Sequence, residues 1–417
     1  MNIKIENFGM NGEGVGKIDG KVYLVDFLLP EETAEIVVTE HHENYCKAKY
    51  VDLLEPSKNR VTPPCPYFYE CGGCALQHAG YSTQLEFKTE LVKNTIRKIA
   101  GIDINASPCV GSNLQYGYRN KISFNFKNGK FGFFRPNSHE LVEIESCMLA
   151  KENLNKVLNL FKNYVSQNQI DCSNLKHLVV REIQNQILVG VVASENLDLT
   201  EFLEMLKSNF ERVGLYLILN TRRDSVVLSG KTIHVGGIKE IEIENFGLKY
   251  FVDLLGFHQT NEYIQNNIYE RVLDLVEPSE IVVNGFSGVG LLSGVLAIKA
   301  NKVYGIEINK NSHFSAEKLK KLNKIDNLTN ICGDFNKEIK KINKFDTLIL
   351  DPSKKGCGEQ VLRDLHADKI IYISCNPIAL SKDLRTLQKS YIIKETIPFD
   401  MFPNTNQVET LVYLVKK

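Results

Sequence analysis

Residues 1–57 show short apolar runs separated by turn signals. The runs at 22–25 and 34–38 are typical of short strands, because each is bounded by residues that end regular structure. The turn signals include Asn11-Gly12, Asp19-Gly20 and Pro30. Several short strands with glycine-rich turns favour a small barrel of the OB type. Pro56-Ser57 then indicates a linker.

The next part of the chain changes from a helical to a strand-like period. Apolar side chains recur at helical spacing from Ser82 onward, which predicts a helix there. Residues 114–240 alternate between apolar and polar positions, as an antiparallel sheet does, most clearly at 122–126, 176–182 and 186–192. We therefore expect an α+β region after the barrel.

From about residue 257 strands and helices alternate along the chain. The expected strands are at 281–283, 302–306, 347–350 and 370–373, and the expected helices at 291–300 and 315–322. This alternation predicts a doubly wound domain with a mostly parallel sheet. The whole chain is therefore expected to be a multidomain α/β protein, with domains at 1–57, 58–250 and 251–417.

Composition excludes several other classes of protein. Apolar residues make up 43% and charged residues 24% of the 417 positions, which excludes disorder and collagen. No run of 18 apolar residues is present and residues 1–6 lack a signal-peptide core, so we expect a cytoplasmic protein with no membrane partner.

The charge balance points to a local rather than a global nucleic-acid surface. The 50 basic and 50 acidic residues cancel. Residues 84–135, however, hold 9 Lys or Arg against 3 Asp or Glu, interleaved with aromatic residues. Basic groups neutralise phosphates and aromatic rings stack on unpaired bases, so this segment is a candidate RNA-binding region. The alternative is a sheet whose aromatic residues form the core.

Three of the ten cysteines lie within ten residues, at Cys65, Cys71 and Cys74. In a reducing compartment such a group favours a metal ion or an iron–sulfur cluster over disulfides. A fourth ligand has to come from elsewhere. Cys147 is the first choice, because it ends the next β-rich stretch, and Cys109 is the second. The spacing alone does not separate zinc from a cluster.

A second candidate site lies where the predicted strands end. Gly288 and Gly290 permit close approach of the backbone to a ligand at the start of the next helix. Glu307 ends the following strand, where an acid can bind a ribose diol. Ser293 stands where the dinucleotide fingerprint has its third glycine, which shifts the expected ligand from NAD to S-adenosylmethionine.

Two more side chains are expected at the same edge of the sheet. Asp351 and Cys375 each follow a predicted strand, and the carboxyl ends of parallel strands lie together. A thiol in this position is a candidate nucleophile. Glu409 precedes a further strand, at 410–415, and has the character of an ordinary surface carboxylate on the residues alone.

Five segments, taken in this order, make the chain similar to the RNA 5-methyluridine methyltransferase family, in the branch with an N-terminal TRAM domain. They are Asn11-Gly12-Glu13-Gly14-Val15-Gly16, Cys65-Pro66 with Cys71-Gly72-Gly73-Cys74, Phe257-His258-Gln259-Thr260-Asn261, Ser374-Cys375-Asn376-Pro377 and Phe402-Pro403 with Val408-Glu409. The similarity extends over nearly the whole chain.

The resemblance implies a fold and two bound groups. The fold is a TRAM barrel, a central α+β domain and a Rossmann-like domain that binds S-adenosylmethionine. The family's cluster motif implies a 4Fe–4S cluster, with ligands Cys65, Cys71, Cys74 and Cys147. The implied partner is RNA, preferably 23S rRNA, with a tRNA uridine as the alternative. No obligate protein partner is implied.

The resemblance also assigns roles to individual residues. The cofactor contacts it implies are Gln259, Phe286 against the cofactor, Glu307 on its ribose, Asp334 near its adenine, and Asp351, which also holds the uracil edge. The implied nucleophile is Cys375 and the implied general base is Glu409. Together these residues imply methylation of uracil at C5 through a covalent adduct of the thiol with C6.

Some positions depart from the family's pattern and keep other functions open. Asn284 and Ser287 replace the usual Asp and Cys, Ser353-Lys354 replaces Pro-Arg, and Gln407 replaces His. Lysine lacks the planar fork of arginine. One alternative is therefore a catalytically weak RNA-binding homologue. Another is a zinc-containing NAD oxidoreductase, against which the missing third glycine argues.

Overall fold

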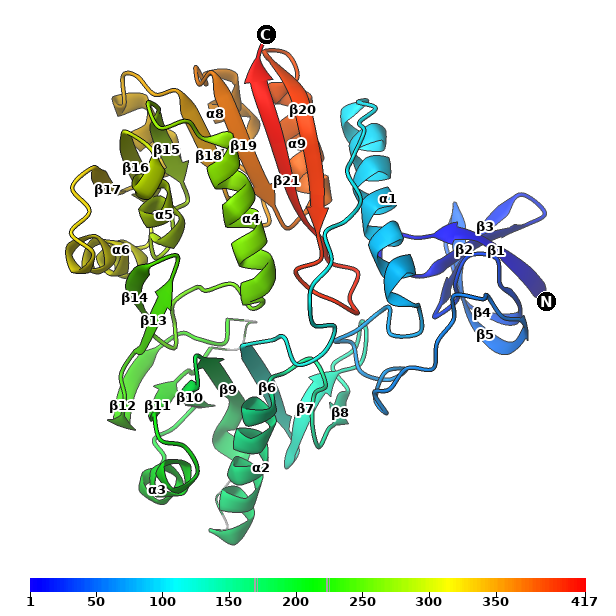
Figure 1. Ribbon diagram of the computed structural model, residues 1–417. Helices are drawn as coiled ribbons and strands as arrows, with labels where there is room; N and C mark the ends of the chain where they lie inside the picture. Colours follow the sequence, from blue (N-terminus) through cyan, green and yellow to red (C-terminus); the bar gives the residue numbers. More distant parts are fainter. Residues whose placement is uncertain (169, 171, 223, 225) are drawn as a thin grey trace.

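The computed structural model describes residues 1–168, 170, 172–222, 224 and 226–417. The chain folds into a barrel at its N-terminus, a central sheet and a second sheet whose strand β21 (Glu409–Lys416) leads to the C-terminus (Figure 1). The helix that follows the barrel stands between the barrel and the second sheet in this view. The domain boundaries at residues 57 and 250 stay a prediction. The helix after the barrel lies in the second predicted domain, but its apolar side chains share a core with the third.

The barrel is closed, with strand order β1-β2-β3-β5-β4. Its strands are β1 (Asn2–Phe8), β2 (Gly14–Ile18), β3 (Lys21–Asp26), β4 (Thr33–His41) and β5 (Tyr45–Glu55). Alternate side chains such as Ile3, Ile5 and Val25 fill its interior. Gly16 allows β1 and β2 to meet closely, since a Cβ there would lie 2.4 Å from the Lys4 carbonyl oxygen. The expected small barrel is confirmed.

The predicted helix after the linker is α1 (Tyr81–Ala100), which ends at Gly101 with φ of 70°. Its apolar stripe, with Val92 and Ile96, packs in one core with α9 (Pro377–Leu387). Lys88, in the same helix, is fully buried and pairs with the buried Asp400. Lys88 belongs to the basic segment that is predicted to bind RNA, but its burial in this ion pair shows that it does not face a phosphate.

The central sheet has seven strands in the order β12-β11-β10-β9-β6-β7-β8. They are β6 (Lys121–Lys127), β7 (Lys130–Phe134), β8 (Leu141–Glu143), β9 (Leu175–Ile183), β10 (Gln186–Ala193), β11 (Val213–Leu219) and β12 (Lys231–Gly237). Helices α2 (Glu152–Gln167) and α3 (Thr200–Asn209) share its core, and η1 (Cys172–Asn174) is a short 3₁₀ turn. The pairing is antiparallel as expected except for β10 and β11, which are parallel because α3 connects them as a crossover.

A hairpin and a helix connect the two sheets. The hairpin consists of β13 (Ile241–Asn245) and β14 (Leu248–Val252), and the helix is α4 (Glu262–Leu275). The hairpin packs against α5 and α6 of the next sheet. Asn261 begins α4 by accepting a hydrogen bond from the Ile264 N–H at 3.3 Å.

The second sheet has seven strands in the order β17-β16-β15-β18-β19-β21-β20. Its strands are β15 (Ile281–Gly285), β16 (Lys302–Glu307), β17 (Leu328–Cys332), β18 (Thr347–Leu350), β19 (Lys369–Ser374), β20 (Tyr391–Phe399) and β21 (Glu409–Lys416). Its helical segments are α5 (Leu291–Lys299), α6 (Lys310–Leu322), α7 (Phe335–Glu338), η2 (Ile339–Lys341), α8 (Glu359–Arg363) and α9. This architecture confirms the expected doubly wound domain.

The direction of β21 decides where the candidate residues meet. The strands from β17 to β19 run parallel to one another, whereas β21 is antiparallel to both β19 and β20. Ser374, at the end of β19, pairs with Thr410, near the start of β21. The start of β21 therefore lies at the edge formed by the carboxyl ends of the parallel strands.

Candidate active site at the edge of the second sheet

Cys375 follows β19 and is held by the start of α9. The side chain of Asn376 accepts a hydrogen bond from the Ile378 N–H at 3.0 Å and so caps α9, with Pro377 in the first turn. Its Nδ2 also donates to the carbonyl oxygen of Lys354 at 2.9 Å. The loop after β18 is thereby tied to the loop that carries the half-buried thiol.

Glu409 is the first residue of β21 and is only 3% exposed. It pairs with Phe399 of β20, on the side of the strand opposite to β19. Its neighbour Thr410 pairs with Ser374, the residue before Cys375. The structure thus brings the predicted nucleophile and the predicted base to adjacent strand ends.

The electrostatics of this edge favour neutral acids. Burial, together with the nearby Glu409 and Asp351 and against the opposing effect of Lys354, raises the pKa of the Cys375 thiol to about 11. Burial and the nearby Asp351 raise the pKa of Glu409 well above its usual range, while Lys354 acts in the opposite direction. Burial raises the pKa of Asp351 to about 7. Lys354 therefore faces two of these acidic groups, Cys375 and Glu409, and a charge on Asp351 or Glu409 disfavours a charge on Cys375.

Three further predicted residues lie at the ends of β15, β16 and β17. Glu307 ends β16, and its two carboxylate oxygens accept the N–H groups of Gly288 at 2.9 Å and Asn309 at 2.7 Å. Phe286 follows β15 with φ of 63°, and its ring centroid lies 4.9 Å from that of Phe335. Asp334 follows β17 and precedes α7. These three side chains occupy the edge where doubly wound sheets bind ligands.

The loop between β15 and α5 has features that suit S-adenosylmethionine. Gly288 and Gly290 have φ of 55° and 84°, and a Cβ on Gly290 would lie 2.6 Å from Ala316. Asn284 is buried and donates to the Ser293 hydroxyl at 2.9 Å, while its Oδ1 has no partner in the described part of the chain. An unpaired buried acceptor can be satisfied by a polar group of a ligand.

The hydrogen bonds of Gln259 are formed with residues near the central sheet. Its carbonyl oxygen accepts from Asn120 Nδ2 at 3.0 Å, and His258 Nδ1 lies 2.9 Å from the same oxygen. Thr260 and Asn261 follow and lead into α4. Asn261 anchors the start of this helix by donating to the Ser112 hydroxyl at 3.0 Å. The hydrogen bonds of Gln259 therefore connect it to the central sheet and not to the strand ends.

The four predicted cysteine ligands share one small cavity of about 90 Å³. Cys65, Cys71 and Cys74 line it from the loop before α1, and Cys147 lines it from the segment after β8. Cys109 does not line this cavity; its N–H donates to the Thr89 hydroxyl at 2.9 Å, on α1. Within the described ranges, no three His, Cys, Asp or Glu side chains are arranged to hold a metal ion.

The four cysteines of this cavity are half-buried, and the surrounding protein disfavours the charged form of three of them. Burial raises the pKa of Cys74 to about 12, and it also raises the pKa values of Cys71 and Cys147. The Gly73 N–H donates to the Cys71 sulfur at 3.4 Å, and the Ala150 N–H donates to the Cys147 carbonyl oxygen at 3.1 Å. Arg119 lines the same cavity. Donors facing sulfur are a feature that thiolate ligands use.

Sequence reasoning missed the roles of Arg119 and Lys354 in this arrangement. Lys354 was noted only as a departure from arginine, although it is the cation that faces Cys375 and Glu409. Arg119 lies in a segment rich in basic and aromatic residues, and nothing in its neighbours distinguishes it. The role of each of these two residues depends on neighbours that are far away in the sequence.

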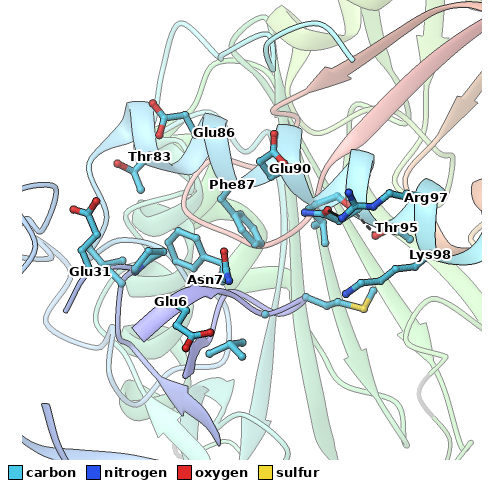
Figure 2. A pocket seen from close by; sticks show the side chains of 18 of the residues that line it. Glu6, Asn7, Glu31, Thr83, Glu86, Phe87, Glu90, Thr95, Arg97 and Lys98 are labelled. Atoms are coloured by element: carbon cyan, nitrogen blue, oxygen red, sulfur yellow. Dashed lines mark hydrogen bonds between the residues drawn. The ribbon is translucent and has the colours of Figure 1, made fainter. Parts of the chain in front are cut away.

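A larger cavity, of about 750 Å³, runs between the barrel and α1. Figure 2 shows Glu6 and Asn7 on the barrel side and Glu86, Glu90 and Arg97 on α1. Its lining also includes Lys98 and Ile378. Because Ile378 lies three residues beyond Cys375, this groove extends to the helix that follows the candidate nucleophile.

Comparisons with known proteins agree along the whole chain. A model of the tRNA (uracil-5-)-methyltransferase family matches residues 80–417, and a model of the TRAM domain matches residues 1–51. An uncharacterized RNA methyltransferase of Clostridium tetani is 31% identical over 441 residues, covering 99% of this chain and 95% of its own. Another, from Caldanaerobacter subterraneus, is 32% identical over 437 residues, covering 98% and 96%.

A solved structure also resembles the fold from end to end. The crystal structure of Pyrococcus abyssi tRNA (uracil-54, C5)-methyltransferase in complex with S-adenosyl-L-homocysteine has a TM-score of 0.81. The sequences are 26% identical, and the similarity covers 100% of this chain and 99% of that one. Within the described residues, no helix is both long enough and apolar enough to cross a membrane.

Proposed function

The chain belongs to the tRNA (uracil-5-)-methyltransferase family, and on that premise we propose that it methylates C5 of a uracil in RNA with S-adenosylmethionine as the methyl donor. The observation that carries this proposal is the position of Cys375 and Glu409 at adjacent strand ends, facing Lys354. The glycine loop and Glu307 form a binding edge for the donor beside them.

In the proposed first step, the Cys375 thiol loses its proton to solvent and the resulting thiolate adds to C6 of the uracil. The electron pair of the C5–C6 double bond moves toward O4, which makes C5 nucleophilic. C5 then attacks the methyl group of the donor, whose carbon–sulfur bond breaks to leave S-adenosylhomocysteine. Phe286, Glu307, Asp334, Asp351 and Gln259 are the residues that we propose to hold the donor. The target base has to leave its stack to reach the thiol.

In the proposed second step, Glu409 accepts the proton from C5 of the methylated adduct. The electrons of that C–H bond restore the C5–C6 double bond, and the C6–sulfur bond breaks to release the thiolate. Burial favours the protonated form of Glu409 in the empty site, so its proton has to leave to solvent before the carboxylate can accept the one from C5. In the adduct the sulfur is a neutral thioether, so Lys354 faces one ionisable group fewer. This change favours the carboxylate form of Glu409 at the stage that needs a base.

We further propose that Cys65, Cys71, Cys74 and Cys147 hold a 4Fe–4S cluster. Four thiolates are the ligand set of such clusters, and these four thiols line one cavity, where the Gly73 N–H donates to the Cys71 sulfur. Bound there, a cluster supplies a cross-link between the loop at 65–74 and the central sheet. No catalytic step requires it.

Which RNA the protein methylates is a separate question. The family resemblance favours 23S rRNA. A tRNA is the second candidate, and the specific observation in its favour is the similarity over the whole chain to an enzyme named for uracil 54 of tRNA. We propose RNA with an exposed uridine as the partner, and the cytoplasmic location stays a prediction.

The test is anaerobic purification followed by methyl transfer. The protein is expected to be brown and to transfer radiolabelled methyl groups from S-adenosylmethionine to one of two substrates, unmodified 23S rRNA or unmodified tRNA. The labelled nucleoside should be 5-methyluridine. Tight RNA binding without methyl transfer would favour the weak RNA-binding homologue instead. A colourless protein would contradict the cluster and leave the methylation result to be judged separately.

We propose that the end of the groove between the barrel and α1 that carries Arg97 and Lys98 holds phosphates of nucleotides that flank the target uridine. The rest of the lining includes the carboxylates of Glu6, Glu31, Glu86 and Glu90, which repel phosphates (Figure 2). Arg97 and Lys98 are exposed at the C-terminal end of α1 and line this groove. Replacing both with alanine is expected to weaken RNA binding and to lower the slope of log affinity against log salt by about 2, since each phosphate contact contributes about 1.

The matched control is the pair Lys320 and Lys321 in the last turn of α6, on the opposite side of the molecule in Figure 1. Their replacement with alanine removes the same charge but should leave the salt slope unchanged. Equal slopes for the two double variants, measured by RNA binding at several salt concentrations, would contradict the proposed RNA path.

A further inference from the structure

The loop that precedes Glu409, residues 400–408, is held from outside its own sheet. We call it the base loop. Asn404, in its middle, is 1% exposed. Its carbonyl oxygen accepts the N–H groups of Ala75 and Leu76, each at 3.0 Å. These two residues directly follow Cys74 in the cysteine loop, residues 65–78. The base loop and the cysteine loop are therefore joined through one residue.

The side chain of Asn404 adds further anchors. Its Nδ2 donates to the carbonyl oxygen of Gln115 at 2.7 Å. Its Oδ1 accepts from Gln84 Nε2 at 3.1 Å, and its main-chain N–H donates to Gln84 Oε1 at 2.9 Å. Gln84, on α1, is 2% exposed and is further fixed by donating to the Ala79 carbonyl at 3.0 Å. Three separate segments thus hold Asn404.

The backbone of Asn404 explains why this residue type suits the position. Its φ is 68°, in the left-handed region that asparagine tolerates better than most residues with a side chain. The turn it makes continues toward Glu409, because the Thr405 hydroxyl donates to the Phe402 carbonyl at 2.8 Å and accepts the Gln407 N–H at 3.2 Å. A displacement of Asn404 is therefore transmitted along a short, hydrogen-bonded path.

Cys375 is held by a different set of contacts. Asn376 ties its loop to α9 and to Lys354, and none of these bonds involves the base loop. The two proposed catalytic groups share the pairing of Ser374 with Thr410, but the base loop before Glu409 and the start of α9 after Cys375 have separate supports among the described residues. Changing one support should move one group while the other stays in place.

We infer that Asn404 is a positioning residue that ties the base loop to the cysteine loop and thereby sets Glu409 for removal of the C5 proton. The inference rests on the proposed function. Loss of Asn404 should therefore slow resolution of the covalent adduct while leaving its formation and methylation nearly unchanged. A residue that served only stability would lower both steps together.

The experiment compares Asn404→Ala with the unaltered protein in two assays on the same RNA. Single-turnover methyl transfer should stay within about twofold. Multiple turnover should fall about 10- to 100-fold, as expected for a catalytic group that is misplaced by about 1 Å. A methylated protein–RNA adduct, seen as a labelled band on a denaturing gel, should accumulate.

The matched control is Asn406→Ala, in the same loop, whose side chain makes no hydrogen bond among the described residues. It should behave as the unaltered protein does. If Asn404→Ala does not fold, Gln84→Met tests the same idea, because it removes two of the anchors and keeps the backbone of the base loop. The inference would be overturned if Asn404→Ala or Gln84→Met lowered both assays equally, or if neither of these two variants accumulated the adduct. Failure of the unaltered protein to methylate RNA would instead overturn the proposed function.

Discussion

Replacing Cys375 with alanine is expected to abolish methylation and the covalent protein–RNA adduct together. Without the sulfur no group is available to add to C6, so C5 does not become nucleophilic and the methyl donor is not consumed. The expected loss of turnover is at least about 10⁴-fold, the scale seen when an enzyme loses its covalent nucleophile. The measurement is radiolabelled methyl transfer, alongside a denaturing gel for the adduct.

The control for this variant is Cys332→Ala. Cys332 ends β17 at the same edge of the sheet and is exposed, so its removal tests for a general effect of losing a thiol there. Turnover of this variant should equal that of the unaltered protein. An adduct that forms equally well with Cys375→Ala would refute the nucleophile assignment.

Replacing Glu409 with glutamine is expected to have the opposite effect on the adduct. Glutamine fills the same buried space but cannot accept the C5 proton, so the methylated adduct should form and then accumulate. Turnover should fall about 10²- to 10⁴-fold, the usual contribution of a positioned general base. Time courses of adduct and of free methylated RNA measure the two steps separately.

A suitable control carboxylate is Glu395 on the neighbouring strand β20. It pairs with Arg271 at 2.5 Å and lies away from the edge with Cys375. Glu395→Gln should resolve the adduct at the normal rate. Unchanged turnover in Glu409→Gln would show that another group removes the proton.

Part of the candidate site follows from local sequence. Glu307, Asp351 and Cys375 each come directly after a strand that the apolar pattern predicts, and parallel strands bring their carboxyl ends to one edge. Glu409 is different, because it reaches that edge only through the antiparallel pairing of β21 with β19. The spacing of residues along the chain contains no sign of that pairing, and the family resemblance alone identified Glu409.

Other features depended on contacts between distant segments. The pattern predicted α1 well, but it could not show that the apolar stripe of α1 packs on α9 or that Lys88 is buried against Asp400. The parallel pairing of β10 with β11 was missed because apolar alternation is the same for either direction. The shared cavity of Cys147 and the cysteine loop likewise depends on tertiary packing.

The buried pair of Lys88 and Asp400 has a consequence for how the chain is made. The two residues are 312 positions apart in the sequence. At the usual pace of synthesis, about 5 to 20 residues per second, the ribosome needs about 15 to 60 s to produce the second after the first. During that interval α1 has neither its ionic partner nor the helix that covers its apolar stripe. The apolar stripe of α1 is therefore exposed until the C-terminal part of the chain has been made, and the catalytic edge is one of the last parts of the molecule to form.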